Sequence, residues 1–186
     1  MKGYFNDFRD AIGFRESDNR YDAVNTIGFI GRYQFGKPRL WDLGISLNRW
    51  KPSRLLPNFH KVVSLKDFLA NHELQDTLFS LHVDLHMTFI RKRYQQYLNR
   101  VAHGILITES GLVAGLHLKG GGSISKPGVT QFLQSGKSNV DGYGTEITEY
   151  INKFGDYCLR YASREEIQEQ FTWVKNLEIK PLDVIV

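Results

Sequence analysis

Glu16 is the side chain best placed in this sequence to act as an acid. It stands with Ser17 at the end of a predicted helix, just before a polar loop. Cleavage of a glycosidic bond requires a proton on the leaving oxygen, and a carboxylic acid in a partly apolar pocket can donate that proton near neutral pH. Ile12 and Phe14 precede Glu16 on the helix and could line such a pocket. The alternative is a solvent-facing glutamate at a helix end.

The loop after Glu16 carries groups suited to a polar ligand. Hydrogen-bonding side chains are frequent over 18–30, and the turn Gly31-Arg32-Tyr33-Gln34 follows. Tyr33 offers a ring that could stack on a sugar, and Gln34 offers an amide that could bind an N-acetyl group. Alternatively, Tyr33 packs in the core and Gln34 holds the loop. Ser17 could bind the sugar, orient Glu16 or simply end the helix.

Asp22 is the candidate for a second catalytic carboxylate. Glycosidases that hydrolyse their substrate usually need such a group as base or nucleophile. Asp22 lies in the loop and could activate water, but an aspartate in a loop more often bonds to its own turn. Hydrolysis and transglycosylation therefore both stay open.

Together with two later segments, these residues resemble the ordered motifs of the lysozyme-like lytic transglycosylases, which include goose-type lysozyme-like proteins. In that family a Glu-Ser pair closes a helix and a Gly-x-x-Gln turn follows. A helix with an Ala-Tyr-Asn-Ala-Gly pattern packs behind the site, and a later Glu-x-x-x-Tyr helix adds a tyrosine. The resemblance covers roughly residues 5–154, through Glu16-Ser17, Asn25, Gly28, Gly31-x-x-Gln34, Ala114-Gly115-Leu116-His117-Leu118 and Glu146-x-x-x-Tyr150.

This resemblance implies cleavage of the β-1,4 bond between N-acetylmuramic acid and N-acetylglucosamine in peptidoglycan. Glu16 would give and then take the proton while a sugar hydroxyl attacks, leaving an anhydro-muramyl end. Leu116 and His117 replace the family's Tyr-Asn pair, as in phage-type and tail-associated members. The substrate contacts implied are Ser17, Asn25, Tyr33, Gln34, His117, Glu146 and Tyr150. We expect no cofactor and no metal.

Three of these residues have plain structural alternatives. A tyrosine such as Tyr150 on the apolar face of a helix is more often only core, although its hydroxyl could tune the proton of Glu16. Glu146, one turn earlier, would share its face. His117 is either a hydrogen-bonded, buried histidine or part of the cleft.

Two further groups of polar residues have types and spacing that could do chemistry. Glu109-Ser110 repeats the Glu-Ser pair but opens a helix, where a glutamate favours the macrodipole, so it is interpreted as structural. His82 and His86 have a spacing that can bind zinc, but a third ligand such as His72 would be needed.

A basic, aromatic stretch, Arg91-Lys92-Arg93 with Tyr94 and Tyr97, supports a rival class, a nucleic-acid-binding protein. It fits better as the solvated face of a long helix. The net charge of +4 is mildly basic and weak evidence for an anionic partner. A non-catalytic peptidoglycan-binding module is the other rival.

Apolar periodicity and capping residues predict a mainly α, lysozyme-like fold. Helices are expected over 4–16, from Pro38, from Ser64, over 71–104 as one or two helices, from Thr108 or Ser110 to Gly120, over 127–133 and from Thr145 to Phe154. A small β element is expected in the loop after Glu16 or at 182–186.

The 186 residues predict a single domain, with a core over 1–155 and an extension over 156–186 that packs on it or docks a partner. The only cysteine, Cys158, excludes an internal disulfide. No signal peptide and no membrane span are evident. Action on the cell wall, in the periplasm or outside the cell, would then require delivery by a phage, a secretion system or a fusion. The expected partners are peptidoglycan strands and a carrier, secretion-apparatus or inhibitor protein, with no nucleic acid.

Overall fold

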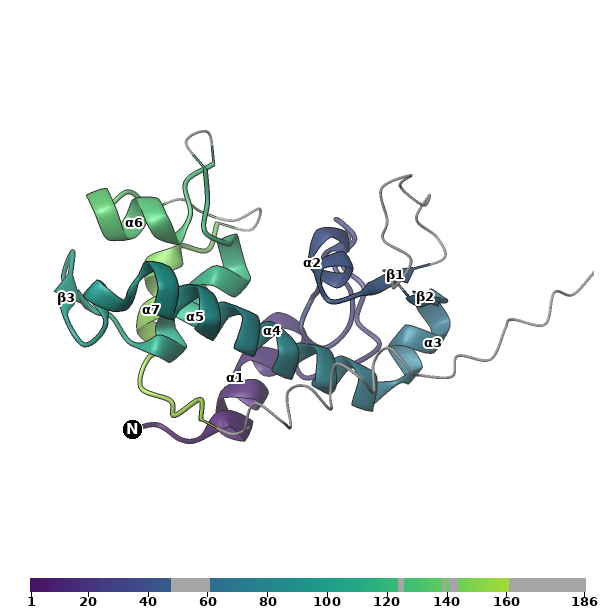
Figure 1. The fold of residues 1–186 in the computed structure, drawn as a ribbon. Coiled ribbons are helices and arrows are strands. Elements are labelled where there is room, and N and C mark those ends of the chain that lie inside the picture. The colour runs from purple at the N-terminus through teal and green to yellow at the C-terminus, as the bar shows by residue number, and fades with distance from the viewer. Residues whose placement is uncertain (48–60, 124–125, 139, 141–143, 161–186) are drawn as a thin grey trace, which may run out of the picture. The chain divides into compact units, whose positions relative to one another are not determined.

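The periodic apolar residues near the N-terminus form helix α1, Phe5–Ser17, which buries Phe5, Phe8 and Ile12. Asp18 and Asn19 end this helix because both adopt positive φ angles, of 55° and 61°. The computed structural model describes residues 1–47, 61–123, 126–138, 140 and 144–160 (Figure 1). The prediction that Glu16 and Ser17 close a helix is confirmed.

Helices account for most of the ordered elements, so the mainly α prediction is confirmed. The helices after α1 are α2 (Lys37–Asp42), α3 (Leu65–Ala70), α4 (His72–Arg93), α5 (Glu109–Lys119), α6 (Val129–Ser135) and α7 (Ile147–Lys153), with a 3₁₀ turn η1 at Gln95–Tyr97 (Figure 1). Two short strand pairs accompany them. Strands β1 (Ile45–Leu47) and β2 (Lys61–Val63) run parallel, whereas β3 (Val101–Ala102) and β4 (Ile105–Leu106) run antiparallel.

Local capping chemistry sets several helix ends where the sequence predicts them. The hydroxyls of Ser64 and Thr108 accept hydrogen bonds from backbone N–H groups in the first turns of α3 and α5. Gly120 and Gly136 follow the last residues of α5 and α6 with φ angles of 65° and 70°. Helix α7 begins at Ile147, two residues after the predicted start at Thr145.

The prediction of one or two helices over 71–104 is wrong beyond Arg93. Helix α4 ends there, and the β3–β4 hairpin occupies 101–106. His103 and Gly104 lie between the strands with φ angles of 51° and 83°, the geometry that a two-residue hairpin turn requires. Helix α2 begins one residue before Pro38, and Gly44 at φ 82° separates it from strand β1.

The chain divides into two compact units, whose boundaries fall within α1 and α4. We call described residues 1–15 and 82–160 the helix unit, and 16–47 with 61–81 the loop unit. The prediction of one domain with a core over 1–155 stays a prediction. None of the described helices combines the length and apolar character needed to cross a bilayer.

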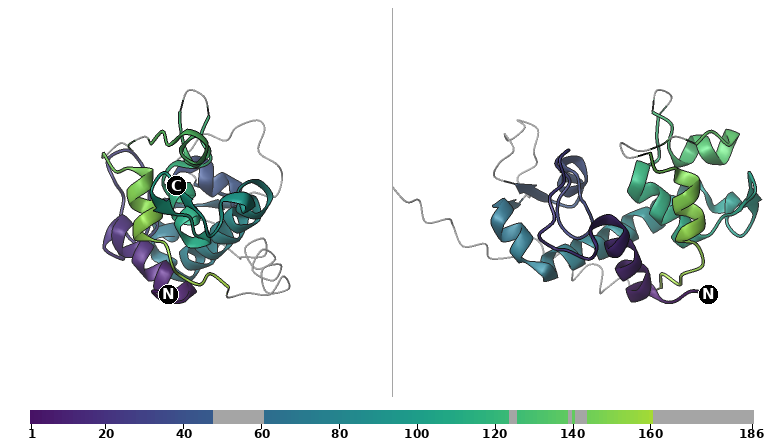
Figure 2. Two further views of the ribbon diagram at one scale, coloured as in Figure 1. Left: turned by 90° about the vertical axis from the view of Figure 1, so that its left-hand side faces the viewer. Right: turned by 180° about the vertical axis from the view of Figure 1, so that it is seen from behind.

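Apolar packing between helices builds the helix unit. Helices α5 and α7 lie side by side (Figures 1 and 2), with Gly111 and Gly115 of α5 against Ile151 of α7. A Cβ atom on Gly111 would lie 2.6 Å from the backbone oxygen of Ile151, so only glycine permits this approach. Residues 156–160 return to the N-terminus, where the N–H groups of Lys2 and Cys158 donate to the carbonyls of Asp156 and Gly3 at 2.7 and 2.9 Å.

The loop unit has a smaller apolar core and a more polar interior. Its fully buried side chains include Ile30, Phe35, Leu40 and Phe68. The predicted β element after Glu16 is present as isolated bridges that pair Val24 with Ile30 and Ile30 with Phe35. The alternative position, at 182–186, lies outside the described residues.

Candidate functional site

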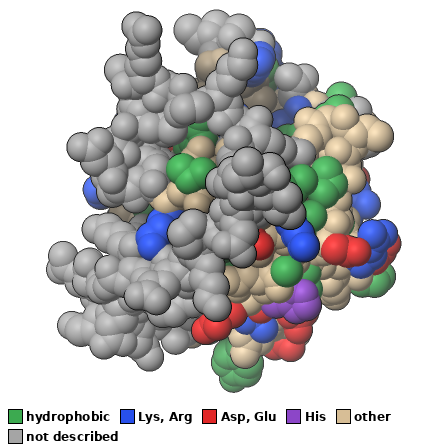
Figure 3. All heavy atoms as spheres, turned by 90° about the vertical axis from the view of Figure 1, so that its right-hand side faces the viewer, with side chains coloured by type: hydrophobic (Ala, Val, Ile, Leu, Met, Phe, Trp, Pro, Cys, Tyr) green, Lys and Arg blue, Asp and Glu red, His purple; other side chains and the backbone are tan. Residues whose placement is uncertain are grey.

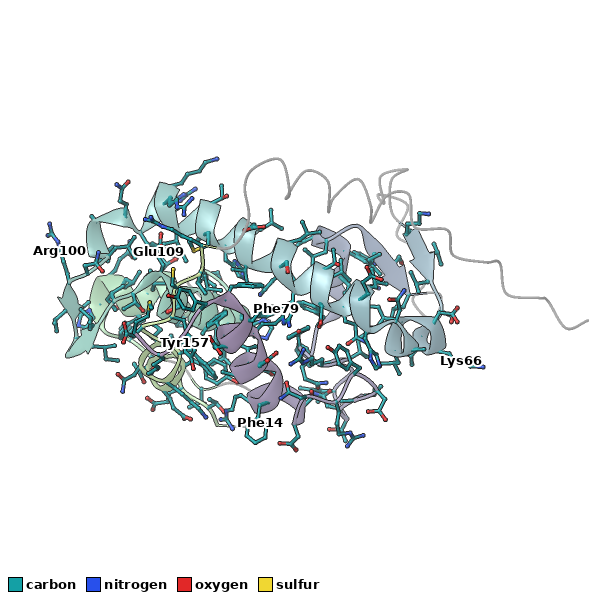
Figure 4. All side chains as sticks on the ribbon, turned by 90° about the horizontal axis from the view of Figure 1, so that it is seen from below. Phe14, Lys66, Phe79, Arg100, Glu109 and Tyr157 are labelled. Atoms are coloured by element: carbon teal, nitrogen blue, oxygen red, sulfur yellow. The ribbon has the colours of Figure 1, made fainter. Side chains whose placement is uncertain are left out.

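Glu16 occupies the last turn of α1 and is half-buried, so its carboxyl group keeps partial access to solvent. The two apolar residues expected to line a pocket for Glu16 differ in burial. Ile12 is fully buried in the core of the helix unit, whereas Phe14 is 63% exposed and projects outward from α1 (Figure 4). Phe14 therefore does not serve as the wall of an enclosed pocket.

Ser17 ties the end of α1 to the following loop. Its hydroxyl donates to the carbonyl oxygen of Arg32 at 2.8 Å and accepts from the backbone N–H of Arg20 at 3.1 Å. Both contacts connect residues of the loop unit. Ser17 thus holds the segment after Glu16 in place, and this structural role is the one of its three alternatives that the contacts support.

Two consecutive tight turns shape the loop. In the first, the side-chain oxygen of Asn25 accepts from the backbone N–H groups of Ile27 and Phe29 at 3.1 and 2.9 Å. In the second, the amide of Gln34 donates to the carbonyl of Gly31 at 2.9 Å, while Gln34 itself has a φ of 45°. Asn25 and Gln34 therefore stabilise turns, and for Gln34 the loop-holding alternative is the observed one.

Gly31 is required where the second turn meets helix α4. Its φ is 74°, and a Cβ atom there would collide with the side-chain oxygen of Gln75. That oxygen accepts the backbone N–H of Arg32 at 2.8 Å, and the amide nitrogen of Gln75 donates to the carbonyls of Tyr21 and Phe68 at 3.1 and 2.9 Å. One buried glutamine thus joins the loop to α3 and α4.

A buried arginine at the centre of this loop is the main feature that sequence reasoning missed. The guanidinium of Arg32 donates to the side-chain oxygen of Asn19 at 2.8 Å and to the hydroxyl of Tyr21 at 2.8 Å. Its Nη1 lies 3.4 Å from Oδ1 of Asp76, with the two side chains 8% and 25% exposed. Asp76 is far away in sequence, so no local pattern could have identified it as the counter-ion.

Tyr33 cannot stack on a sugar, which corrects the sequence prediction. Its side chain is fully buried and stacks on the ring of Phe79 with a centroid distance of 4.1 Å. Its hydroxyl donates to Oδ1 of Asp76 at 2.6 Å. Phe79 lies among the other side chains in Figure 4. The core alternative for Tyr33 is therefore the correct one, because this ring presents no face to a ligand.

The hydroxyl of Tyr21 completes the network around Asp76. It donates toward both oxygens of that carboxylate at 3.0 Å. Burial raises the pKa of the Tyr21 phenol, and its hydrogen bond to Asp76 raises the pKa further, although Arg32 opposes the shift. Tyr21 therefore stays neutral and continues to donate to Asp76 under ordinary conditions.

Asp22, the candidate second carboxylate, is exposed at the surface of the loop. Its Oδ1 lies 3.3 Å from Nε of Arg20, and its side chain is 73% exposed. A carboxylate in this setting is well solvated and accessible to water. Its role as a catalytic base stays a prediction.

Three further predicted substrate contacts, Tyr150, Glu146 and His117, belong to the helix unit. Tyr150 is 3% exposed, with its ring 5.1 Å from that of Phe154 and beneath the guanidinium of Arg15 at 5.7 Å. Glu146 is exposed at the residue before α7 and accepts from the hydroxyl of Thr148 at 2.9 Å. Glu146 is exposed and Tyr150 is buried, and the face that they were expected to share stays a prediction. Their relation to Glu16 stays a prediction.

His117 belongs to a cluster of three imidazoles in the helix unit. Its Nδ1 lies 3.0 Å from Nε2 of His82, and the rings of His82 and His86 meet edge to face with centroids 4.2 Å apart. His82 and His86 are buried and His117 is half-buried. The contact to His82 agrees with the hydrogen-bonded alternative for His117, and its place in a cleft stays a prediction. In the described ranges, no three His, Cys, Asp or Glu side chains are arranged to hold a metal ion.

No protein-family model, curated protein or solved structure that was compared with this chain matches it.

Proposed function

We propose that this protein is a lysozyme-like glycosidase that cleaves the MurNAc-β-1,4-GlcNAc bond of peptidoglycan, with Glu16 as its general acid and base. The observation that carries the proposal is the placement of Glu16. Its carboxyl stands half-buried in the last turn of α1, directly before a loop whose conformation is held by buried polar contacts. Catalysis needs an acid whose position is defined by rigid surroundings, and Ser17 and Arg32 supply that rigidity.

In the proposed reaction, Glu16 donates its proton to the glycosidic oxygen as the bond to the anomeric carbon of N-acetylmuramic acid breaks. The 6-hydroxyl of the same sugar then attacks that carbon and returns its proton to Glu16. The glycan is cut without consuming water, and the new end is a 1,6-anhydro sugar. If Asp22 activates a water instead, the same bond is hydrolysed and a reducing end results.

The loop residues take supporting roles in this mechanism. Ser17, Gln34 and Gln75 fix the backbone around Gly31 through the hydrogen bonds given above. They act as positioning residues. Tyr33, buried in the core, also holds the loop through its hydrogen bond to Asp76. The sugar would be bound by exposed groups of the loop and by backbone groups near its turns.

Clearing of purified sacculi by the full chain tests the proposal. Replacing Glu16→Gln keeps the shape of the side chain but removes the acid, so activity should fall by about 10²–10⁴-fold. Glu109→Gln is the matched control, because Glu109 also precedes a serine but begins α5 and lies 3.6 Å from Nε of Arg91. This control should clear sacculi at the wild-type rate.

Equal clearing by the Glu16→Gln variant would refute the assignment of the acid. Sacculus binding without clearing by the wild type would instead indicate a non-catalytic peptidoglycan-binding module. Mass spectrometry of the soluble products separates the two reactions, since anhydro-muropeptides indicate transglycosylation and reducing ends indicate hydrolysis.

A further inference from the structure

The helix unit contains a cavity at the end of α4 that the proposed glycosidase does not use. It lies between the last turn of α4, η1 and α6 and has a volume of about 120 Å³. Its lining includes Arg93, Tyr94, Gln96, Tyr97, Thr130 and Gln134. The basic, aromatic stretch of the sequence thus contributes to a cavity and is more than a solvated helix face.

Buried aromatic and apolar groups define the inside of this cavity. Tyr94 and Leu133 are 4% and 3% exposed. The hydroxyls of Tyr94 and Thr130 share a hydrogen bond of 2.6 Å, and the ring of Phe89 meets that of Tyr94 edge to face at 5.3 Å. The hydrogen bond between Tyr94 and Thr130 joins the residue after α4 to α6 within the lining of the cavity.

Polar groups at the rim complement the apolar interior. Arg93, Gln96 and Gln134 are exposed, and Tyr97 is half-buried. The guanidinium of Arg93 lies over the ring of Phe89 at 6.0 Å. Arginine can donate to phosphate in a bidentate manner, and glutamine amides can both donate to and accept from the edge of a base.

The enclosed part of this open cavity has room for about one ring. A protein cavity of about 150 Å³ can hold benzene, and this one is slightly smaller. A single six-membered ring therefore fits, whereas an extended ligand must leave the cavity after that ring. A pyrimidine base and a sugar ring both meet this limit.

The positive charge beside the cavity favours a nucleotide, which carries phosphate, over a neutral sugar. Arg91, Lys92 and Arg93 are exposed in the last turn of α4, and Arg93 is one of the residues that line the cavity. Such a segment attracts a chain of phosphates. By contrast, acidic and basic side chains are interspersed on the face shown in Figure 3.

We propose that this cavity binds single-stranded nucleic acid, with one pyrimidine base inserted beside Tyr94 and Tyr97 and an adjacent phosphate contacted by Arg93. Aromatic side chains next to a positively charged path are the usual means of binding single strands. This activity is additional to the proposed peptidoglycan cleavage and does not depend on Glu16.

Fluorescence anisotropy with a labelled oligothymidylate of about 12 nucleotides, a length within the usual range of single-strand sites, tests the proposal on the full chain. Tyr97→Ala should weaken binding by about tenfold, as loss of one stacking ring does. Arg93→Ala should weaken it and reduce the slope of log affinity against log salt by about one. Lys66→Ala, which removes an exposed charge from α3 (Figure 4), is the matched control and should bind like the wild type.

Competition separates base binding from attraction to charge alone. An abasic oligonucleotide and inorganic polyphosphate should compete at least tenfold less well than oligothymidylate. The proposal is overturned if they compete equally well, if Tyr97→Ala binds like the wild type while retaining its thermal unfolding midpoint, or if no oligonucleotide binds. Glu16→Gln should bind the oligonucleotide normally, so failure of either proposal leaves the other standing.

Discussion

Different kinds of interaction stabilise the interiors of the two compact units of this protein. In the helix unit, α5 and α7 meet through glycines and branched apolar side chains. In the loop unit, residues 17–35 are fixed by a buried arginine, an aspartate, two tyrosines and a glutamine. A packed apolar core accepts substitutions that conserve volume at a cost of less than about 1.5 kcal/mol, whereas a buried charge depends on each of its partners.

This difference indicates which unit is suited to carry a chemical site. A loop built mainly from apolar contacts has few means of fixing the direction of a polar group. The network around Arg32 instead defines the backbone that follows Glu16, through the hydrogen bond between Ser17 and the Arg32 carbonyl. The polar interior of the loop unit thus stabilises a conformation that its small apolar core would not specify.

The largest effect is expected from Asp76→Ala. This change leaves the guanidinium of Arg32 buried without its counter-ion, which should cost about 3–5 kcal/mol in the free energy of unfolding. Asp22→Ala removes the same group from an exposed pair and should cost less than about 1 kcal/mol. Urea denaturation followed by circular dichroism measures both values. Similar values for the two variants would contradict the central role of Asp76.

The corresponding change in the helix unit is Gly111→Ala. Its new methyl group would meet the backbone oxygen of Ile151. Such overpacking lowers the free energy of unfolding by about 1–3 kcal/mol. The higher helix propensity of alanine offsets about 1 kcal/mol of this loss. Gly115→Ala is the matched control, since its methyl would meet only the side chains of Ile151 and Val129, at 3.0 and 3.2 Å. Thermal denaturation should show net destabilisation for Gly111→Ala and almost none for Gly115→Ala. The reverse order would show that α7 can move away from α5.

A smaller effect is expected at Asn25, where two variants separate folding from function. Asn25→Ala removes the acceptor for two backbone N–H groups and should cost about 1 kcal/mol. Asn25→Asp keeps that acceptor and should preserve stability. If the Asn25 amide also binds the glycan, Asn25→Asp should clear sacculi more slowly at unchanged stability. Equal clearing would restrict Asn25 to its turn.

The smallest effect is a loss of stability at alkaline pH. The pKa of Tyr21 is raised above its ordinary value of 10.0, chiefly by burial and then by Asp76, and the pKa of Tyr94 is raised by burial. The folded state favours the neutral phenol, so each tyrosine contributes to the free energy of unfolding. This contribution is fully present below the pKa of the unfolded state and is lost as pH rises through the pKa of the folded state. Tyr21→Phe and Tyr94→Phe should each reduce the alkaline slope of the unfolding free energy. An unchanged slope in either variant would contradict the shift at that residue.

Sequence patterns predicted most of the helices because their signals are local. Apolar spacing specifies α1, and Ser64, Thr108, Gly120 and Gly136 act on the backbone beside them. The region after Arg93 was mispredicted because its leucines and tyrosines continue a helical pattern. There, the positive φ angles of Asn99, His103 and Gly104 favour a turn and a hairpin instead.

Roles within the candidate site were harder to predict, because they depend on partners distant in the chain. The sequence identified Glu16 at a helix end and a polar loop that follows it in the chain. It did not distinguish a Tyr33 that stacks on a sugar from one that stacks on Phe79. It also gave no sign that Arg32, in the middle of a turn, is buried against Asp76.

The sequence by itself thus determined the mainly helical architecture, the helix that ends at Glu16 and Ser17, and the glycine-dependent turns, since each follows from neighbouring residues. Only the tertiary structure decided that the loop is held by an internal ion pair, that Tyr33 is core, and that Tyr94 and Thr130 enclose a cavity. The physical reason is that burial and counter-ion pairing are set by packing between distant segments, which local residue patterns do not encode.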